Sequence, residues 1–246
     1  MTASKAPRRG QSVNELLGTA VSVFRATLLK CLPLAMIGVL CASVPNFYLR
    51  ATGTVVEPGM KMPTEPTYWG LMVLAVVGTL YIFSAMMLRQ LYCSGGFTVE
   101  ARQELVVAAR RLPTLVVSWV LMQASLALGF LLVLPGIFLL VCYLVLLPVI
   151  LLEGQRNPLL ALRRCIMLVK DNWWRICTSF VIALLGTLVC FLAFSAFMAI
   201  LHELLGGLGQ AFEAIFAAAM VAAFAMAFVF YSALALVIHS SASNSA

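Results

Sequence analysis

Six long apolar segments constrain this chain more than any other feature of its sequence. Each is close to or longer than the roughly 20 residues that a helix needs to cross the hydrocarbon core of a bilayer. They cover roughly residues 28–49, 69–88, 113–134, 136–152, 176–201 and 212–238. The mean hydropathy is +1.05, and charged residues make up only 10% of the 246 residues. Because backbone polar groups must pair within hydrocarbon, the sequence predicts an all-α, polytopic membrane protein with six transmembrane helices.

The basic residues are divided unequally between the two sides that these segments define. Of the 16 Lys and Arg residues, only Arg50 and Lys61 fall on the side that carries the 50–68 loop. Cytoplasmic loops carry an excess of Lys and Arg, so we expect a bacterial inner-membrane protein with both termini in the cytoplasm. The cations are also expected to attract anionic lipid head groups at the cytoplasmic face. Their dispersal along membrane-adjacent segments argues against nucleic-acid binding.

Three short amphipathic segments are expected to precede pairs of spans on the cytoplasmic side. The first opens with Ser12 and Glu15 at capping-box spacing. The second runs from about residue 99 to 112, where charged residues, Glu104 among them, predict a surface helix. The third follows Asn157 and Pro158, a good pair for a helix start. These segments are too short and too charged to span, so they are predicted to lie in the membrane interface. Packing as cytoplasmic helices on the span ends is the alternative.

The resulting organisation is a single membrane domain built from three similar units. The units cover about residues 12–88, 98–152 and 157–238, within a domain of residues 12–239. Residues 1–11 are predicted to form a disordered tail, and residues 240–246 a short C-terminal tail.

The third amphipathic segment carries the clearest interfacial signal. Its apolar residues recur at helical spacing, and Arg163, Arg164 and Lys170 lie on the opposite face. The apolar stripe consists of Leu159, Leu162, Ile166, Val169 and Trp173. Trp173 and Trp174, flanked by Lys170 and Arg175, are typical of an anchor at the inner aromatic belt.

Motifs that would carry chemistry are absent from the sequence. His202 and Glu203 begin like a zinc-protease helix, but position 206 is Gly where that motif needs a second histidine. The seven cysteines form no C-x-x-C pair and none lies in an outer loop, so free thiols are expected. We therefore expect no enzyme activity, no metal and no cofactor. Gln123 is the strongly polar side chain nearest mid-membrane, and it is expected to form a hydrogen bond between helices.

A stretch of about 40 residues resembles a known group of bacterial inner-membrane families. It reads Leu147-Pro148 followed by Glu153-Gly154, then Asn157-Pro158-Leu159-Leu160-Ala161-Leu162-Arg163-Arg164, and ends in Trp173-Trp174-Arg175. This pattern is similar to the YciC-like proteins and to the membrane domain found beside glycerophosphoryl diester phosphodiesterases. Cys165 stands where those families often have Ser. The resemblance implies a six-helix inner-membrane protein without established activity, and the phosphodiesterase barrel is absent.

The same stretch predicts an ion pair from its residues alone. Glu153 ends the fourth span, and Arg163 or Arg164 lies one to two turns into the next helix. A short reversal between them allows the carboxylate to pair with an arginine, which would lock the interfacial helix against the bundle.

Two functional hypotheses remain open at this point. The first is a non-enzymatic protein of envelope organisation or a subunit of a membrane complex, with protein partners or further copies of itself. The second is a transporter or flippase for a lipid-like or hydrophobic solute. The near absence of ionisable residues within the spans argues against ion-coupled transport.

Reporter fusions test the topology that the charges predict. Fusions after Gln155 and after Ala246 should report a cytoplasmic location, and a fusion within residues 54–64 a periplasmic one, because the basic residues flank the first two sites. A periplasmic C-terminus would require an odd number of spans and would contradict the six-helix topology.

Overall fold

A computed structural model describes residues 12–53, 65–97, 101–130, 133–170, 172–204 and 209–243. The regular secondary structure of these ranges is helical throughout. The helices are α1 (Val13–Ala51), α2 (Pro66–Ser94), α3 (Ala101–Phe130), α4 (Val133–Leu152), α5 (Pro158–Lys170), α6 (Trp173–Leu204) and α7 (Gly209–Ser243). The all-α prediction is confirmed. The predicted tail of residues 1–11 lies outside the described residues, whereas residues 240–243 of the predicted C-terminal tail continue α7.

Five of these helices are long and apolar enough to cross a membrane. They are α1, α2, α3, α6 and α7, counted within the described residues. The apolar part of α4, Phe138–Leu152, is shorter than the others. A multi-pass membrane protein is therefore supported, with five candidate spans among the described residues, and the expected span of residues 136–152 is not one of these five.

The first two amphipathic segments are not separate helices. Residues 13–27 are the beginning of α1, and residues 101–112 are the beginning of α3. The Ser12–Glu15 capping box that starts α1 is present, with the Glu15 amide donating to Ser12 Oγ over 3.3 Å. No glycine or proline interrupts the chain between Gly18 and Pro33, so the helix continues into the apolar segment. Only the third segment, α5, stands apart from the helix that follows it.

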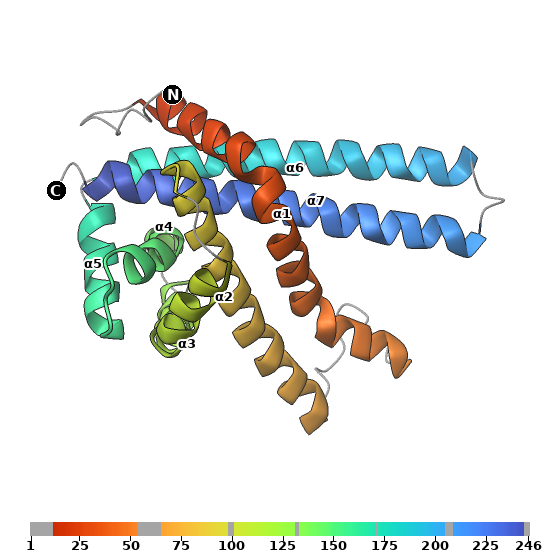
Figure 1. The fold of residues 1–246 in the computed structure, drawn as a ribbon, viewed down its shortest axis with the longest axis horizontal. Coiled ribbons are helices and arrows are strands. Elements are labelled where there is room, and N and C mark those ends of the chain that lie inside the picture. Colours follow the sequence, from red (N-terminus) through yellow and green to blue (C-terminus); the bar gives the residue numbers. More distant parts are fainter. Residues whose placement is uncertain are drawn as a thin grey trace.

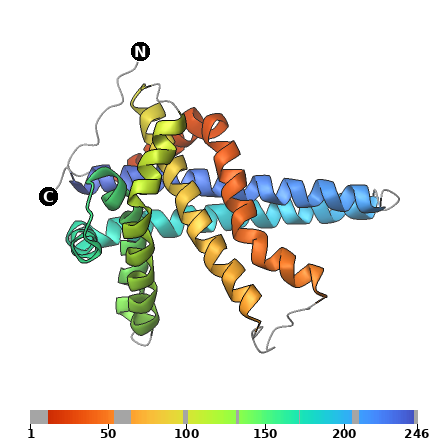
Figure 2. The same ribbon diagram turned by 60° about the horizontal axis from the view of Figure 1, so that its bottom comes forward.

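The helices converge at one end and diverge at the other. Figures 1 and 2 show α1 with α2, α3 with α4, and α6 with α7 as three hairpins that spread from a common region near the start of α1 and the end of α7. The main buried cluster lies in that region. It includes Leu16 near the start of α1, Leu88 near the end of α2 and Ile238 near the end of α7. In α6, by contrast, Ile176, Ser179, Ala183 and Met198 are the buried residues.

Gln90 is a polar side chain that joins three helices in the converging region. Its side chain is fully buried in α2, and its amide nitrogen donates to Thr27 Oγ1 of α1 and to the Val229 carbonyl of α7, each over 3.1 Å. Interhelical hydrogen bonds of this kind supply part of the attraction that apolar contacts cannot provide between helices in lipid. Three helices from two hairpins therefore meet at one amide.

Gln123, the glutamine that the sequence pointed to, does not have this role. Its side chain is exposed in α3, and none of the described residues is recorded as its hydrogen-bond partner. The expected interhelical bond is not seen among the described residues, because Gln123 lies on an exposed side of α3, about 100° around the helix from the buried Met122. Gln90 was missed because it follows Arg89, which made this part of the chain look like the end of a span.

The two glutamines provide a matched stability test. Gln90→Leu should destabilise the detergent-solubilised protein by about 1 kcal/mol, because it removes two buried interhelical hydrogen bonds. Gln123→Leu should leave stability unchanged or raise it, since it replaces an exposed amide in an apolar helix. Thermal unfolding followed by circular dichroism measures both. Equal effects of the two substitutions would show that Gln90 does not hold the hairpins together.

Candidate functional site

A cluster of charged and titratable side chains lies where α4, α5 and α7 meet. Glu153 follows the last residue of α4, and its carboxylate accepts from Arg164 Nε of α5 over 3.0 and 3.2 Å. The other partner is His239 of α7, whose Nε2 lies 3.1 Å from Glu153 Oε1. His239 is buried, while Glu153 and Arg164 are partly exposed. One carboxylate thus bridges three helices.

Of the two arginines considered for this pair, Arg164 lies at the carboxylate and Arg163 is exposed to the outside of α5. The reversal between α4 and α5 depends on Gly154, which has φ +70° and accepts from Arg111 Nη1 over 2.6 Å through its carbonyl. A Cβ at this position would lie 3.0 Å from Arg111 Nη2. Glycine is therefore favoured by the backbone conformation, and a larger residue here would also displace the end of the Arg111 side chain.

A second ion pair joins α2 to the beginning of α3. Arg89 Nε lies 2.8 Å from Glu104 Oε2, and Arg89 Nη1 also donates to the Lys30 carbonyl of α1 over 3.4 Å. Glu104 is only 3% exposed, so its assignment to a surface helix was wrong. The carboxylate faces the neighbouring helix because α3 begins as a continuous helix packed on the end of α2.

The predicted interfacial residues lie at the same end of the molecule. Trp174 is 69% exposed, and its ring centroid lies 4.3 Å from that of Trp173. Lys170 is exposed, while Arg175 Nη2 donates to Ser241 Oγ of α7 over 3.3 Å. The Asn157 side chain accepts from the Leu159 amide, which confirms the predicted helix start.

The buried face of α5 differs from the predicted apolar stripe. Ala161, Cys165, Leu168 and Val169 are buried, whereas Leu159 and Ile166 of the stripe are 66% and 42% exposed. The smaller residues pack on the bundle because they allow α5 to lie close to α4 and α7. Part of the large apolar stripe therefore faces away from the rest of the chain.

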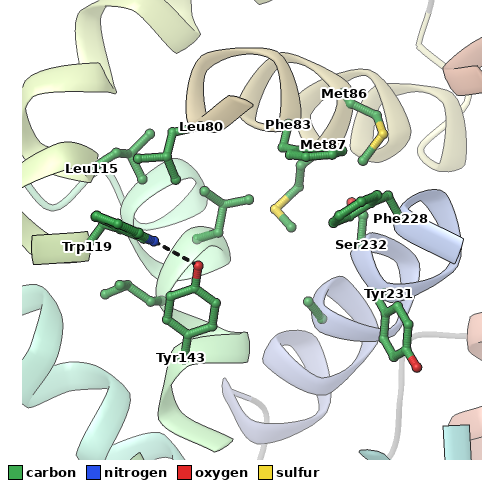
Figure 3. Close-up of a pocket in the computed structure, with 13 residues that line it drawn as sticks. Leu80, Phe83, Met86, Met87, Leu115, Trp119, Tyr143, Phe228, Tyr231 and Ser232 are labelled. Atoms are coloured by element: carbon green, nitrogen blue, oxygen red, sulfur yellow. Dashed lines mark hydrogen bonds between the residues drawn. The ribbon is translucent and has the colours of Figure 1, made fainter. Parts of the chain in front are cut away.

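An apolar cavity of about 180 Å³, partly open to the outside, lies between four of the helices. Its walls come from α2, α3, α4 and α7, and Figure 3 shows the residues that line it. Trp119 Nε1 donates to the Tyr143 hydroxyl over 3.1 Å at one side of the cavity. Phe83, Met87 and Phe228 contribute further aromatic and thioether groups. None of the described residues that line the cavity is charged.

Metal or nucleophilic chemistry finds no support among the described residues. No group of three or more His, Cys, Asp or Glu side chains in this part of the chain is placed to hold a metal ion. All seven cysteines are free. Burial raises the pKa of the Cys165 thiol, and the nearby Cys142 and Glu153 add to that effect. A thiol held in its protonated form is a poor nucleophile.

Sequence reasoning found part of this region and missed the rest. The pairing of Glu153 with an arginine could be predicted from the sequence, because both residues lie in one short stretch. His239 lies 86 positions from Glu153. Tyr143 and Ser232, which both line the cavity, look like ordinary span residues, so no local pattern pointed to any of the three. A histidine at the end of the last span was the one available signal.

Comparison with models of protein families, with characterised proteins and with solved structures gives no match.

A double-mutant cycle tests whether Glu153 and Arg164 are coupled. Glu153→Ala and Arg164→Ala should each lower thermal stability, because each leaves a partly desolvated charge without its partner. The combined variant should be less destabilised than the sum of the two, with a coupling energy of about 1 kcal/mol. The measurement is thermal unfolding of the purified protein in detergent.

Arg163→Ala provides the control for this cycle, since Arg163 is exposed on the same helix. It should show no coupling to Glu153→Ala. Strict additivity for the Arg164 pair, or coupling of equal size for Arg163, would contradict the role given to Arg164.

Proposed function

We propose that this chain is a non-enzymatic, six-span protein of the bacterial inner membrane that serves as a subunit of a membrane complex, in a role of envelope organisation. In this proposal α4 also crosses the membrane and brings the number of spans to six. The converging end of the helices faces the cytoplasm. The excess of Lys and Arg residues at that end supports this cytoplasmic orientation. The stretch around Glu153 resembles YciC-like proteins and the membrane domain found beside phosphodiesterases. This resemblance also implies a bacterial inner-membrane protein with six spans.

The observation that carries the proposal is the exposure of α6. The helix has 32 residues, of which four are described as buried. Figures 1 and 2 show α6 and α7 extending together away from the other helices. Val189 and Leu192 of α6 are 64% and 59% exposed. A long apolar helix with so little packing inside its own chain offers its surface to lipid and to another transmembrane helix.

Membrane lipids are proposed as partners of α5, at the converging end of the helices. The exposed Leu159 and Ile166 of α5 give this helix an apolar side, and the exposed Arg163 and Lys170 give it cations. This combination suits a helix in the interface, with its cations toward anionic head groups. The Trp173–Trp174 pair also supports a position at the membrane interface, because indole rings favour the interfacial region.

The cavity favours a second candidate function, which is transport of a lipid-like or hydrophobic solute. The cavity is apolar and is formed between hairpins, as expected for a solute of that class. Solute flux in proteoliposomes distinguishes this candidate from the subunit role. Flux that depends on the protein would favour the transporter.

Site-specific photocrosslinking in native membranes tests the subunit proposal. A benzophenone amino acid at Val189 of α6 should give a protein adduct of discrete mass, because this position faces the proposed partner helix. Val73 of α2 is the matched control, since it is also a valine in an apolar helix and is 63% exposed. It should give mainly lipid adducts.

The identity of the adduct decides the kind of assembly. An adduct of twice the chain mass indicates a second copy, and any other discrete mass indicates a different subunit. If Val189 gave only lipid adducts, like Val73, the exposed face of α6 would be a lipid-facing surface and the subunit proposal would fail.

A further inference from the structure

The apolar cavity between α2, α3, α4 and α7 lies below the charged end of the bundle. Ser232 precedes His239 by seven residues along α7, or roughly 10 Å of helix, and Tyr143 precedes Glu153 by ten residues along α4, or roughly 15 Å. Half of the hydrocarbon core is about 15 Å thick. With the charged cluster at the membrane boundary, the two hydroxyls lie between that boundary and the middle of the bilayer. This inference uses the membrane placement proposed above but not the proposed role as a subunit.

The lining of the cavity selects against a charged occupant. None of its residues carries a charge that could pair with an ionic group, and an unpaired charge at this depth is costly. The head group of a phospholipid is therefore excluded from the cavity. What enters it is an uncharged molecule dissolved in the membrane.

Two hydroxyls give the cavity a specific polar character. Ser232 is 7% exposed, and its Oγ has no hydrogen-bond partner among the described residues. The Tyr143 hydroxyl accepts from Trp119 Nε1, and no acceptor for its own proton is recorded in the described part of the chain. Figure 3 shows Tyr143 and Ser232 on opposite sides of the cavity. A buried hydroxyl without a partner is unfavourable, so an occupant that accepts a hydrogen bond from Ser232 would relieve that cost. Tyr143 is 38% exposed, so its hydroxyl carries no such cost and serves only as a second donor.

The remaining lining favours a flat conjugated ring. Phe83, Trp119, Tyr143 and Phe228 supply aromatic rings, and Met86 and Met87 supply thioethers. Aromatic rings and sulfur both make favourable contacts with another ring. The volume of about 180 Å³ is somewhat larger than the engineered cavity of about 150 Å³ that admits benzene. One six-membered ring with small substituents fits this volume, and its tail would leave between the helices.

We propose that this cavity binds the ring of a membrane-dissolved quinone-type lipid, with its two carbonyl oxygens accepting hydrogen bonds from the Tyr143 and Ser232 hydroxyls. The proposal concerns binding alone and assigns no electron transfer to the chain. It accounts for the unpartnered Ser232 hydroxyl, the aromatic lining and the absence of charge with one ligand class.

Fluorescence of Trp119 provides the test. The full-length protein is placed in phosphatidylcholine nanodiscs with Trp69, Trp173 and Trp174 replaced by Phe, so that Trp119 is the only indole. Decylplastoquinone, a benzoquinone with two methyl groups and a hydrocarbon tail, is added and quenching is measured. We expect saturable quenching of Trp119. The control is a chain in which Trp119 is also replaced by Phe and the only indole is introduced by Leu188→Trp on the exposed helix α6. It should show only the weaker quenching caused by quinone dissolved in the bilayer.

Ser232→Ala separates a ligand-binding role from a structural one. In the proposal it weakens quinone binding by about 2- to 10-fold, as expected for one lost neutral hydrogen bond. It should also leave the ligand-free protein as stable as before or more stable, because it removes a buried hydroxyl that has no partner. Ser125→Ala is the matched control, since Ser125 already donates to the Leu121 carbonyl over 2.8 Å, and it should not change quinone binding. Ala235→Phe, which fills the cavity, should abolish the saturable quenching.

A competitor without carbonyl groups completes the test. Decylbenzene has a similar ring and tail, and it should compete with decylplastoquinone more weakly than the quinone itself does. Equal competition, with no effect of Ser232→Ala, would show that the cavity accepts any hydrocarbon and would overturn the quinone assignment. Identical quenching of Trp119 and of the Leu188→Trp control would show that the cavity binds no quinone. The competition experiment and the comparison with the Leu188→Trp control can both be interpreted even if the Ala235→Phe variant fails to fold.

Discussion

The Gln90 amide, buried between α1, α2 and α7, ties the α1–α2 hairpin to the α6–α7 hairpin by hydrogen bonds. Helices surrounded by lipid gain little from contact between apolar side chains, because the lipid tails offer a similar environment. Close packing and polar contacts must therefore determine which helices meet. In this chain those contacts are concentrated at one end, where Arg89 pairs with Glu104 and Glu153 joins Arg164 and His239. The remaining length of each hairpin extends outward from this end.

Hydropathy predicted the helical segments well, and helix starts followed from local residues. The Ser12 and Asn157 caps are present as expected, because a cap needs only neighbours in sequence. Length and apolar content could not tell where one helix ends and another begins inside a continuous helical stretch. The residues from 13 to 51 therefore form one helix in place of an interfacial segment followed by a span.

Side-chain environment was harder to predict than helix position. Gln123 and Gln90 are both glutamines in apolar helices, yet one is exposed and the other is fully buried. Glu104 looked like surface material because its neighbours are charged, although its own face of α3 packs on α2. The orientation of each helix about its axis decides these cases, and that orientation depends on partners from distant parts of the sequence. The cavity is a product of the same packing, since it takes residues from four helices.

Hairpins that are joined at one end have a mechanical consequence for the membrane around them. The apolar helix α6, with 32 residues, has a length of about 48 Å, which is well above the roughly 30 Å hydrocarbon thickness of a typical bilayer. Such a helix adapts to the bilayer by tilting, at a cost of fractions of a kcal/mol for each Å of mismatch. Because the far ends of the three hairpins have few contacts with one another, each can tilt separately. The spread of the hairpins, and with it the width of any space between them, is therefore expected to follow the local thickness of the bilayer.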